Sequence, residues 1–219
     1  MKDLIAELEA VQRTVGYGNL PAGEARVVTL SRTYSAAVDD VWDAVTSPER
    51  IPRWFLPVSG ELRAGGTYQL EGNAGGEIRV CDAPRHLQVT WVMGPEGPED
   101  SSVVDVRLEP ADDGTRLTLE HTAVVPPEMW DQFGPGAVGV GWDGALLGLG
   151  LHLAGVEGAI DPETLATDPA VRAFNTASSE AWGAALAASD GLDADTVAAR
   201  VAATTAFYVP PLDSDATTR

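Results

Sequence analysis

Alternation of apolar and polar residues over residues 76–123 is the feature of this sequence that most constrains its fold. Four segments share a period of two, which is the period of a β-strand with one buried and one exposed face. The turn sequences NAGG and ADDG flank or separate them, and such turns are typical of β-hairpins. We therefore predict an antiparallel sheet whose covered face carries Ile78, Val80, Leu87, Val89, Trp91, Met93, Val104, Val106, Leu108, Leu117 and Leu119.

The opposite face of the predicted sheet is charged, which suits contact with water. By the same parity, Cys81 falls on this charged face. It is the only cysteine of the chain, so neither an intramolecular disulfide nor a thiolate metal cluster can form. We do not expect a nucleophilic thiol, because no base is near Cys81 in the sequence.

Helical spacing of apolar residues occurs on both sides of this strand region. Residues 37–46 and 48–55 each favour a short helix, the second with Ser47 as its N-cap. A long helix is expected from Gly141 onward. The order of elements predicts an α+β fold in which this helix lies across a curved sheet. The residues that share one face of the long helix are Trp142, Leu146, Leu149 and Leu153.

Changes in composition divide the chain into four predicted parts. Residues 1–24 are expected to form an N-terminal helix and a linker, and residues 25–157 the α+β domain. Residues 158–208 are rich in alanine and favour a helical C-terminal extension, with Asp168 as an N-cap. Residues 209–219 are typical of a disordered tail.

The formal net charge of −19 limits the classes of partner. Nucleic acids and anionic membranes are polyanions, so we expect neither as a partner. The most apolar stretch, residues 137–156, is interrupted by Asp143 and His152, which argues against a membrane-spanning helix. The N-terminus is acidic and amphipathic and lacks the pattern of a signal peptide, so the expected compartment is the cytoplasm.

Glycines in the predicted long helix are unusual, because each costs about 1 kcal/mol relative to alanine. Gly141, Gly144 and Gly148 either leave room for a ligand or let the helix approach the sheet closely. The sequence GPGAVG matches a dinucleotide-binding pattern, but no buried strand precedes it, so a flexible helix entry is the better interpretation.

His121 is the histidine that best supports a functional hypothesis. It continues the inward parity of Leu117 and Leu119, and a polar group there needs a buried neighbour, water or a ligand as partner. His86, His121 and His152 show no metal-binding spacing, and no carboxylate pair suggests an acid and a base. We therefore expect no metal and no cofactor.

The stretch VWDAVTSPERIPRWFLPVSGELRAGGTYQLEGNAGGEIRV resembles the opening of domains related to the activator of the heat-shock-protein-90 ATPase. The segments GTRLTLEHTAV and GWDGALLGLGLHL are similar to the last strand and closing helix of such domains. The resemblance covers about residues 25–155 and implies the helix-grip fold of the START-like (SRPBCC) superfamily. It is carried by Trp42, Pro48, Trp54, Phe55, Gly65 and Gly66.

The resemblance implies three kinds of function, and the sequence leaves them open. The favoured one is a non-enzymatic protein that binds a small apolar molecule between sheet and long helix. The others are a chaperone-contacting module, and a cyclase or hydrolase in which His121 would be the acid–base group. The C-terminal extension could also form a homodimer surface. The predicted ligand-binding residues are Trp54, Phe55, Tyr68, Trp91, His121, Trp142, Leu146 and Leu149.

Overall fold

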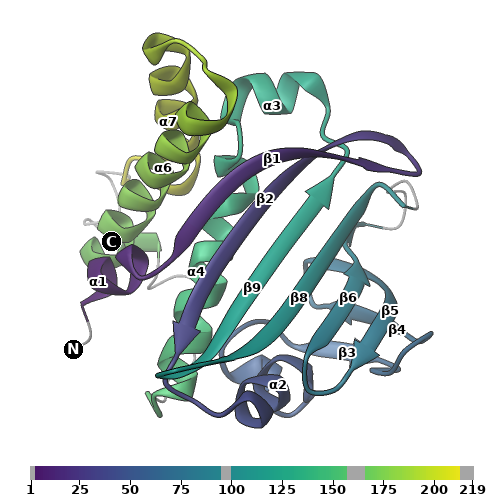
Figure 1. Cartoon of the computed structure of the whole chain (residues 1–219). Helices are drawn as coiled ribbons and strands as arrows, with labels where there is room; N and C mark the ends of the chain where they lie inside the picture. Colours follow the sequence, from purple (N-terminus) through teal and green to yellow (C-terminus); the bar gives the residue numbers. More distant parts are fainter. Residues whose placement is uncertain (1–2, 95–99, 157–165, 213–219) are drawn as a thin grey trace, which may run out of the picture.

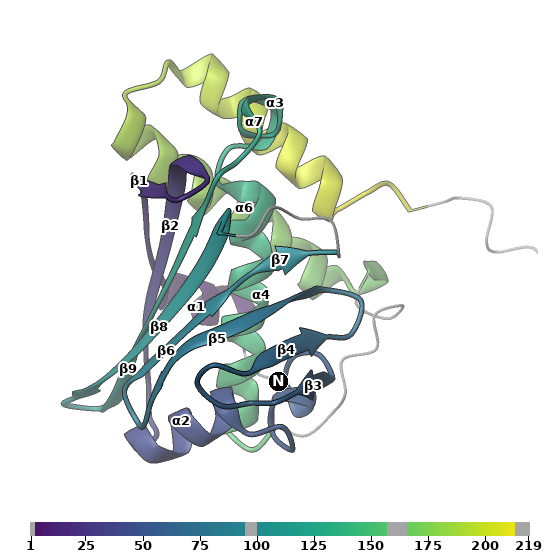
Figure 2. The same ribbon diagram turned by 90° about the vertical axis from the view of Figure 1, so that its right-hand side faces the viewer.

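The structure, a computed structural model, describes residues 3–94, 100–156 and 166–212. Its centre is an antiparallel sheet with the strand order β1-β2-β9-β8-β6-β5-β4-β3, and β7 pairs with β5 off this path. The sheet is curved, as Figures 1 and 2 show. The strands are β1 (Gln12–Leu20), β2 (Gly23–Tyr34), β3 (Val58–Gly60), β4 (Thr67–Leu70), β5 (Ala74–Asp82), β6 (His86–Thr90), β7 (Val92–Met93), β8 (Ser102–Ala111) and β9 (Gly114–Ala123).

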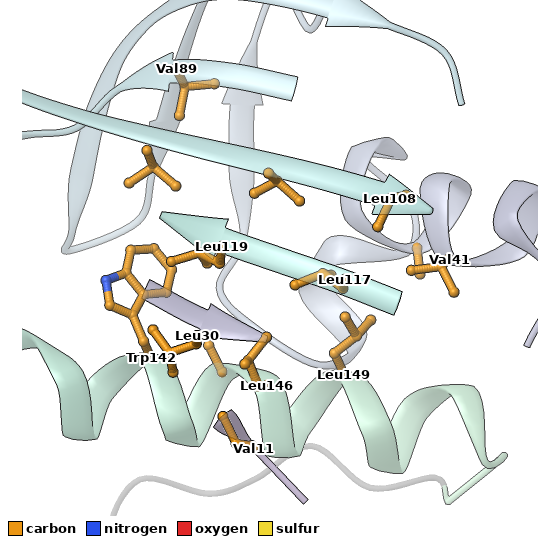
Figure 3. Close-up of a cluster of buried hydrophobic side chains, with 14 of the residues drawn as sticks. Val11, Leu30, Val41, Val89, Leu108, Leu117, Leu119, Trp142, Leu146 and Leu149 are labelled. Carbon is orange, nitrogen blue, oxygen red and sulfur yellow. The ribbon is translucent and has the colours of Figure 1, made fainter. Parts of the chain in front are cut away.

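Helix α4 (Gly136–Leu153) lies across the covered face of this sheet (Figure 2). Its side chains Trp142, Leu146 and Leu149 point toward the strands, where they meet residues such as Leu30 and Leu119 (Figure 3). The α+β, helix-grip architecture expected from the sequence is therefore confirmed. The helix begins at Gly136, earlier than the predicted Gly141, because the turn at Gly134 ends the preceding helix α3 (Pro127–Phe133).

The apolar character of α4 has a structural cause: the helix is covered on more than one side. The sheet covers one side, and α6 (Pro169–Asp190) and α7 (Ala194–Tyr208) pack against another. Glycines allow this close packing, since a Cβ at Gly139 would lie 2.3 Å from Cε2 of Trp182. A helix that is buried on several sides is apolar all round. Within the described residues, no helix is long and apolar enough to cross a membrane.

The N-terminal part differs from its prediction as a helix followed by a linker. Helix α1 is shorter than expected (Leu4–Glu9), and residues 16–24, which were taken for a linker, form the end of strand β1, the turn after it and the start of β2. This strand pairs with β2 from Gln12↔Ser31 to Leu20↔Gly23. The glycines and asparagine of this stretch favour a turn locally, but the long antiparallel pairing outweighs that preference.

The C-terminal extension contains the predicted helices. Asp168 is the N-cap of α6, where its side chain accepts hydrogen bonds from the backbone N–H groups of Ala170 and Val171. The predicted disordered tail begins at residue 209, and residues 213–219 of it lie outside the described residues. Whether the four predicted parts are separate units stays a prediction.

The second predicted short helix is wrong in length and in its start. Helix α2 (Val38–Thr46) ends with Ser47 as its C-cap rather than as the N-cap of a new helix. The next element along the chain is the 3-10 turn η1 (Ile51–Arg53). Pro52 lacks a backbone N–H and so cannot continue a regular helical ladder.

A β-bulge corrects the predicted position of Cys81. The pairing of β5 with β6 shifts between Ile78, which faces Val89, and Val80, which faces Gln88. One extra residue reverses the side to which all later residues of the strand point. Cys81 therefore lies on the covered face, and Val80 does not contribute to that face as predicted.

Candidate ligand-binding site

A cavity of about 140 Å³ lies between the sheet and α4 and is partly open; we call it the enclosed cavity because the sheet and the helix lie on either side of it. Its walls come from α2, η1, α4 and every strand from β3 to β9 except β7. The lining is almost entirely apolar, with Thr46, Cys81 and the hydroxyl of Tyr68 among its few polar groups. The Tyr68 hydroxyl donates to the backbone oxygen of Thr90 over 2.7 Å, so it is already satisfied within the protein.

Most of the predicted ligand-binding residues meet around this cavity. Trp54, Phe55, Tyr68, Trp91, Trp142, Leu146 and Leu149 line it, whereas His121 does not. The sequence interpretation missed the wall made by Val45, Ile51, Val58 and Leu62, which come from α2, η1, β3 and the loop after β3. It also missed Cys81, because the bulge in β5 carries no clear signal in the sequence.

The adjacent aromatic residues Trp54 and Phe55 both line the enclosed cavity. Their rings are stacked with centroids 5.5 Å apart. The indole N–H of Trp54 donates to the backbone oxygen of Ala44 over 2.9 Å, which anchors the ring to α2. A Cβ at Gly148 would lie 2.5 Å from the backbone oxygen of Trp54. Gly148 is therefore a close-approach position between α4 and this turn.

Gly141 and Gly144, the other two glycines considered in the sequence analysis, have different surroundings. A Cβ at Gly144 would meet no atom within 4 Å, and Gly144 is exposed. Gly141 borders a second pocket rather than the enclosed cavity. Of the alternatives for these glycines, close approach accounts for Gly148, and none of the three makes room in the enclosed cavity.

His121 is buried, and both of its ring nitrogens have protein partners. Nδ1 accepts the indole N–H of Trp142 over 3.0 Å, and Nε2 lies 2.8 Å from Oγ of Ser102. An indole N–H can only donate, so Nδ1 carries no proton and Nε2–H donates to Ser102. Burial lowers the pKa of His121 to about 4, which keeps the ring neutral at pH 7. His121 thus holds Trp142 in place.

A second pocket, which we call the open pocket, has a volume of about 640 Å³ and lies beside the enclosed cavity. Phe55, Trp91 and Trp142 line both spaces and form the partition between them. The rings of Trp91 and Trp142 are 4.8 Å apart at their centroids. His121 borders the open pocket and not the enclosed cavity.

The side chains around the enclosed cavity and the open pocket give little support for catalysis by a thiolate or a metal ion. Burial raises the pKa of the Cys81 thiol, which disfavours the nucleophilic thiolate. Among the residues that the structure describes, no group of three or more His, Cys, Asp or Glu side chains could hold a metal ion. The arrangement is suited to holding an apolar molecule by shape.

Residues 35–153 match the family described as "Activator of Hsp90 ATPase homolog 1-like protein". The crystal structure of CalU16 from Micromonospora echinospora is 40% identical, with a TM-score of 0.65, over 81% of this chain and 98% of that chain. The solution NMR structure of CalU16 is 38% identical, with a TM-score of 0.67, over 82% of this chain and 96% of that chain. No curated protein matches this chain.

DynU16, a protein from the dynemicin biosynthetic locus, has a similar fold. It is 22% identical, with a TM-score of 0.54, over 62% of this chain and 49% of that chain. The family match extends from the start of α2 through the strands to the end of α4, the elements that build the enclosed cavity. With more than half of its length matched, the chain belongs to the family of Activator of Hsp90 ATPase homolog 1-like proteins.

Proposed function

We propose that this protein binds a small apolar molecule in the enclosed cavity, without catalysis. The observation that carries the proposal is an apolar cavity of about 140 Å³ inside the grip of the sheet on α4. A closed apolar cavity on the order of 150 Å³ is large enough to bind molecules such as benzene. The volume therefore favours a ligand with one aromatic ring or a short aliphatic chain.

The aromatic lining supports this choice of ligand. Trp54, Phe55 and Trp91 present ring surface to the cavity. Aromatic rings pair favourably with other rings in offset or edge-to-face arrangements, in addition to the gain from burying apolar area. The hydrogen-bonding groups of Trp54 and Trp142 are directed at Ala44 and His121, so the cavity offers a ligand little polar recognition.

The geometry of His121 argues against the alternative of a cyclase or hydrolase. A general base must reach the proton that it removes, and both nitrogens of His121 are engaged by Trp142 and Ser102. The chaperone-contacting alternative rests on the family description and stays a prediction. It would be tested by adding the protein to a chaperone of that class and measuring ATP hydrolysis.

The test of apolar binding uses toluene as the probe and NMR of the methyl groups that line the cavity. We expect chemical-shift changes for Leu146, Leu149 and their neighbours on addition of toluene. Ala145 lines the cavity, so Ala145→Phe should fill it and abolish these changes. Gly144→Ala is the matched control on the exposed side of the same helix and should bind as the wild type does.

Two results would contradict the proposal: no response of the wild-type methyl groups to toluene, or an equal response in Ala145→Phe. If the Phe variant does not fold, Ala145→Leu, a substitution with a smaller side chain at the same position, replaces it in the experiment. Native mass spectrometry of the purified protein would then identify a ligand retained from the cell.

A further inference from the structure

The covered face of the sheet changes in polarity along strand β2. Arg26, Val28, Leu30 and Arg32 alternate with the residues of the other face, so their side chains share one side. The central rows are apolar, since Leu30 pairs with Leu119 of β9. Toward the open pocket each pair of facing residues includes one polar side chain: Val28 pairs with His121, and Arg26 pairs with Ala123. A cation therefore ends the apolar face at the open pocket.

The two arginines of this row have different electrostatic partners. Arg32, at one end, forms an ion pair with Glu7 of α1. Arg26, at the other end, has no carboxylate within ion-pair distance among the described residues. This is notable in a chain with a net charge of −19. A partly buried guanidinium without a counter-ion is unfavourable, and an anion beside it would be stabilised.

Aromatic rings hold the guanidinium of Arg26 from the sides. Its central carbon lies 4.4 Å from the ring centroid of Tyr17 and 4.6 Å from that of Trp130. These contacts fix the guanidinium plane, while the N–H groups at its edge still need acceptors. Its Nη1 atom is buried and has no hydrogen-bond partner among the described residues. The side chain is thus positioned and incompletely satisfied.

The open pocket has one formal charge in its described lining, and that charge is Arg26. The rest includes apolar side chains that stay exposed: Met93 at 62%, Met129 at 43% and Val138 at 40%. Exposed apolar side chains around a hollow are typical of binding sites. The volume of about 640 Å³ lies in the usual range for small-molecule sites.

We propose that the open pocket is a second binding site, for a small amphipathic carboxylate. The acid group would accept the N–H groups of Arg26, and the apolar body would cover Met93, Met129 and Val138. Carboxylates match the fork of a guanidinium, and such charge-assisted hydrogen bonds are stronger than neutral ones. The proposal does not rest on the one for the enclosed cavity, since Arg26 lines only the open pocket, although Phe55, Trp91 and Trp142 line both spaces.

The experiment compares octanoate with 1-octanol, which have the same chain length and differ in charge, by isothermal titration calorimetry. Arg26→Gln should weaken octanoate binding by about tenfold or more and change 1-octanol binding by less than about twofold. Arg63→Gln is the control, because it removes the same charge from an exposed arginine paired with Glu61. It should leave both affinities unchanged.

Three results would overturn the proposal. In the first, Arg26→Gln leaves octanoate binding unchanged. In the second, it weakens octanoate and 1-octanol equally. In the third, Ala145→Phe, which fills the enclosed cavity, abolishes octanoate binding. If Arg26→Gln does not fold, the wild type still provides a test: octanoate, and not 1-octanol, should shift the indole N–H resonance of Trp130 through its contact with Arg26.

Discussion

Trp142 donates its indole N–H to Nδ1 of His121 over 3.0 Å, and the two rings meet edge to face with centroids 5.7 Å apart. This contact joins α4 to β9 beside the aromatic partition between the two spaces. It requires an unprotonated Nδ1, since a protonated imidazole has two donors and no acceptor. The position of Trp142 therefore depends on the charge state of His121.

We predict that acid weakens the fold through His121. Its pKa falls from 6.5 to about 4 on folding, so the unfolded chain binds more protons between these values. Stability from this group is complete above about pH 6.5 and is lost as the pH falls toward 4. The total loss is about 3 kcal/mol in the free energy of unfolding. Urea unfolding at a series of pH values measures it.

The control for this prediction is His121→Gln, whose amide oxygen can still accept from Trp142 but does not titrate. Burial, and after it Arg50, also lowers the pKa of His152. The wild type therefore contains a second histidine whose contribution to the free energy of unfolding decreases in acid. The difference between wild type and variant isolates His121. An unchanged pH dependence in His121→Gln would mean that His121 does not contribute as described.

Much of the fold was predictable because local pattern and tertiary environment agree. Strands β8 and β9 have one face in the core and one in water, so their alternation is regular. Strand β1 was not predictable, since Gly16 and Gly18 suit a turn and become a strand by pairing with β2. Tertiary pairing outweighed local preference there.

The lining of the enclosed cavity was predictable where the alternation along the strands and the spacing along the helix indicate side chains that face each other between sheet and helix. Trp91, between β6 and β7, and Trp142 of α4 both line the enclosed cavity. Cys81 was misplaced because a bulge reverses parity without a clear signal. His121 is buried on the covered face, but it borders the open pocket rather than the enclosed cavity. Sequence periodicity gives the side of a strand and not the cavity that it borders.

Asp143 ties the C-terminal extension to the sheet, and we predict that Asp143→Asn destabilises the fold. Its carboxylate is 1% exposed and accepts from Arg13 over 2.8 Å, from Ser178 over 2.5 Å and from Trp182 over 3.0 Å. Removing the negative charge leaves the buried guanidinium of Arg13 without a counter-ion. The expected loss is about 3–5 kcal/mol in the free energy of unfolding, measured by urea denaturation.

The control for Asp143 is Asp40→Asn, which breaks an ion pair of Arg50 in which the Asp40 side chain is 49% exposed. We expect it to cost less than about 1 kcal/mol. The double variant Arg13→Met with Asp143→Leu removes both charges and should recover stability relative to Asp143→Asn. Equal effects of Asp143→Asn and Asp40→Asn would refute the structural role of the buried pair.

Leu149→Ala should destabilise the protein and enlarge the enclosed cavity. Leu149 is 1% exposed and lines the cavity, so its truncation removes buried apolar area and leaves a larger space. The expected cost is about 2–5 kcal/mol. Titration with toluene and the bulkier naphthalene should show that the variant gains affinity for naphthalene relative to the wild type. If both proteins reject naphthalene equally, the surroundings have collapsed into the space.

Gly144 and Gly148 form a matched pair on α4, and alanine should have opposite effects at the two positions. At Gly144 the added methyl group meets no atom within 4 Å, so helix propensity should raise stability by about 1 kcal/mol. At Gly148 the same group would lie 2.5 Å from the backbone oxygen of Trp54, which cannot move without displacing the turn. We expect a loss of about 1–3 kcal/mol there. Urea denaturation of both variants measures the difference, and toluene binding should weaken in Gly148→Ala alone, because Trp54 and Phe55 border the enclosed cavity.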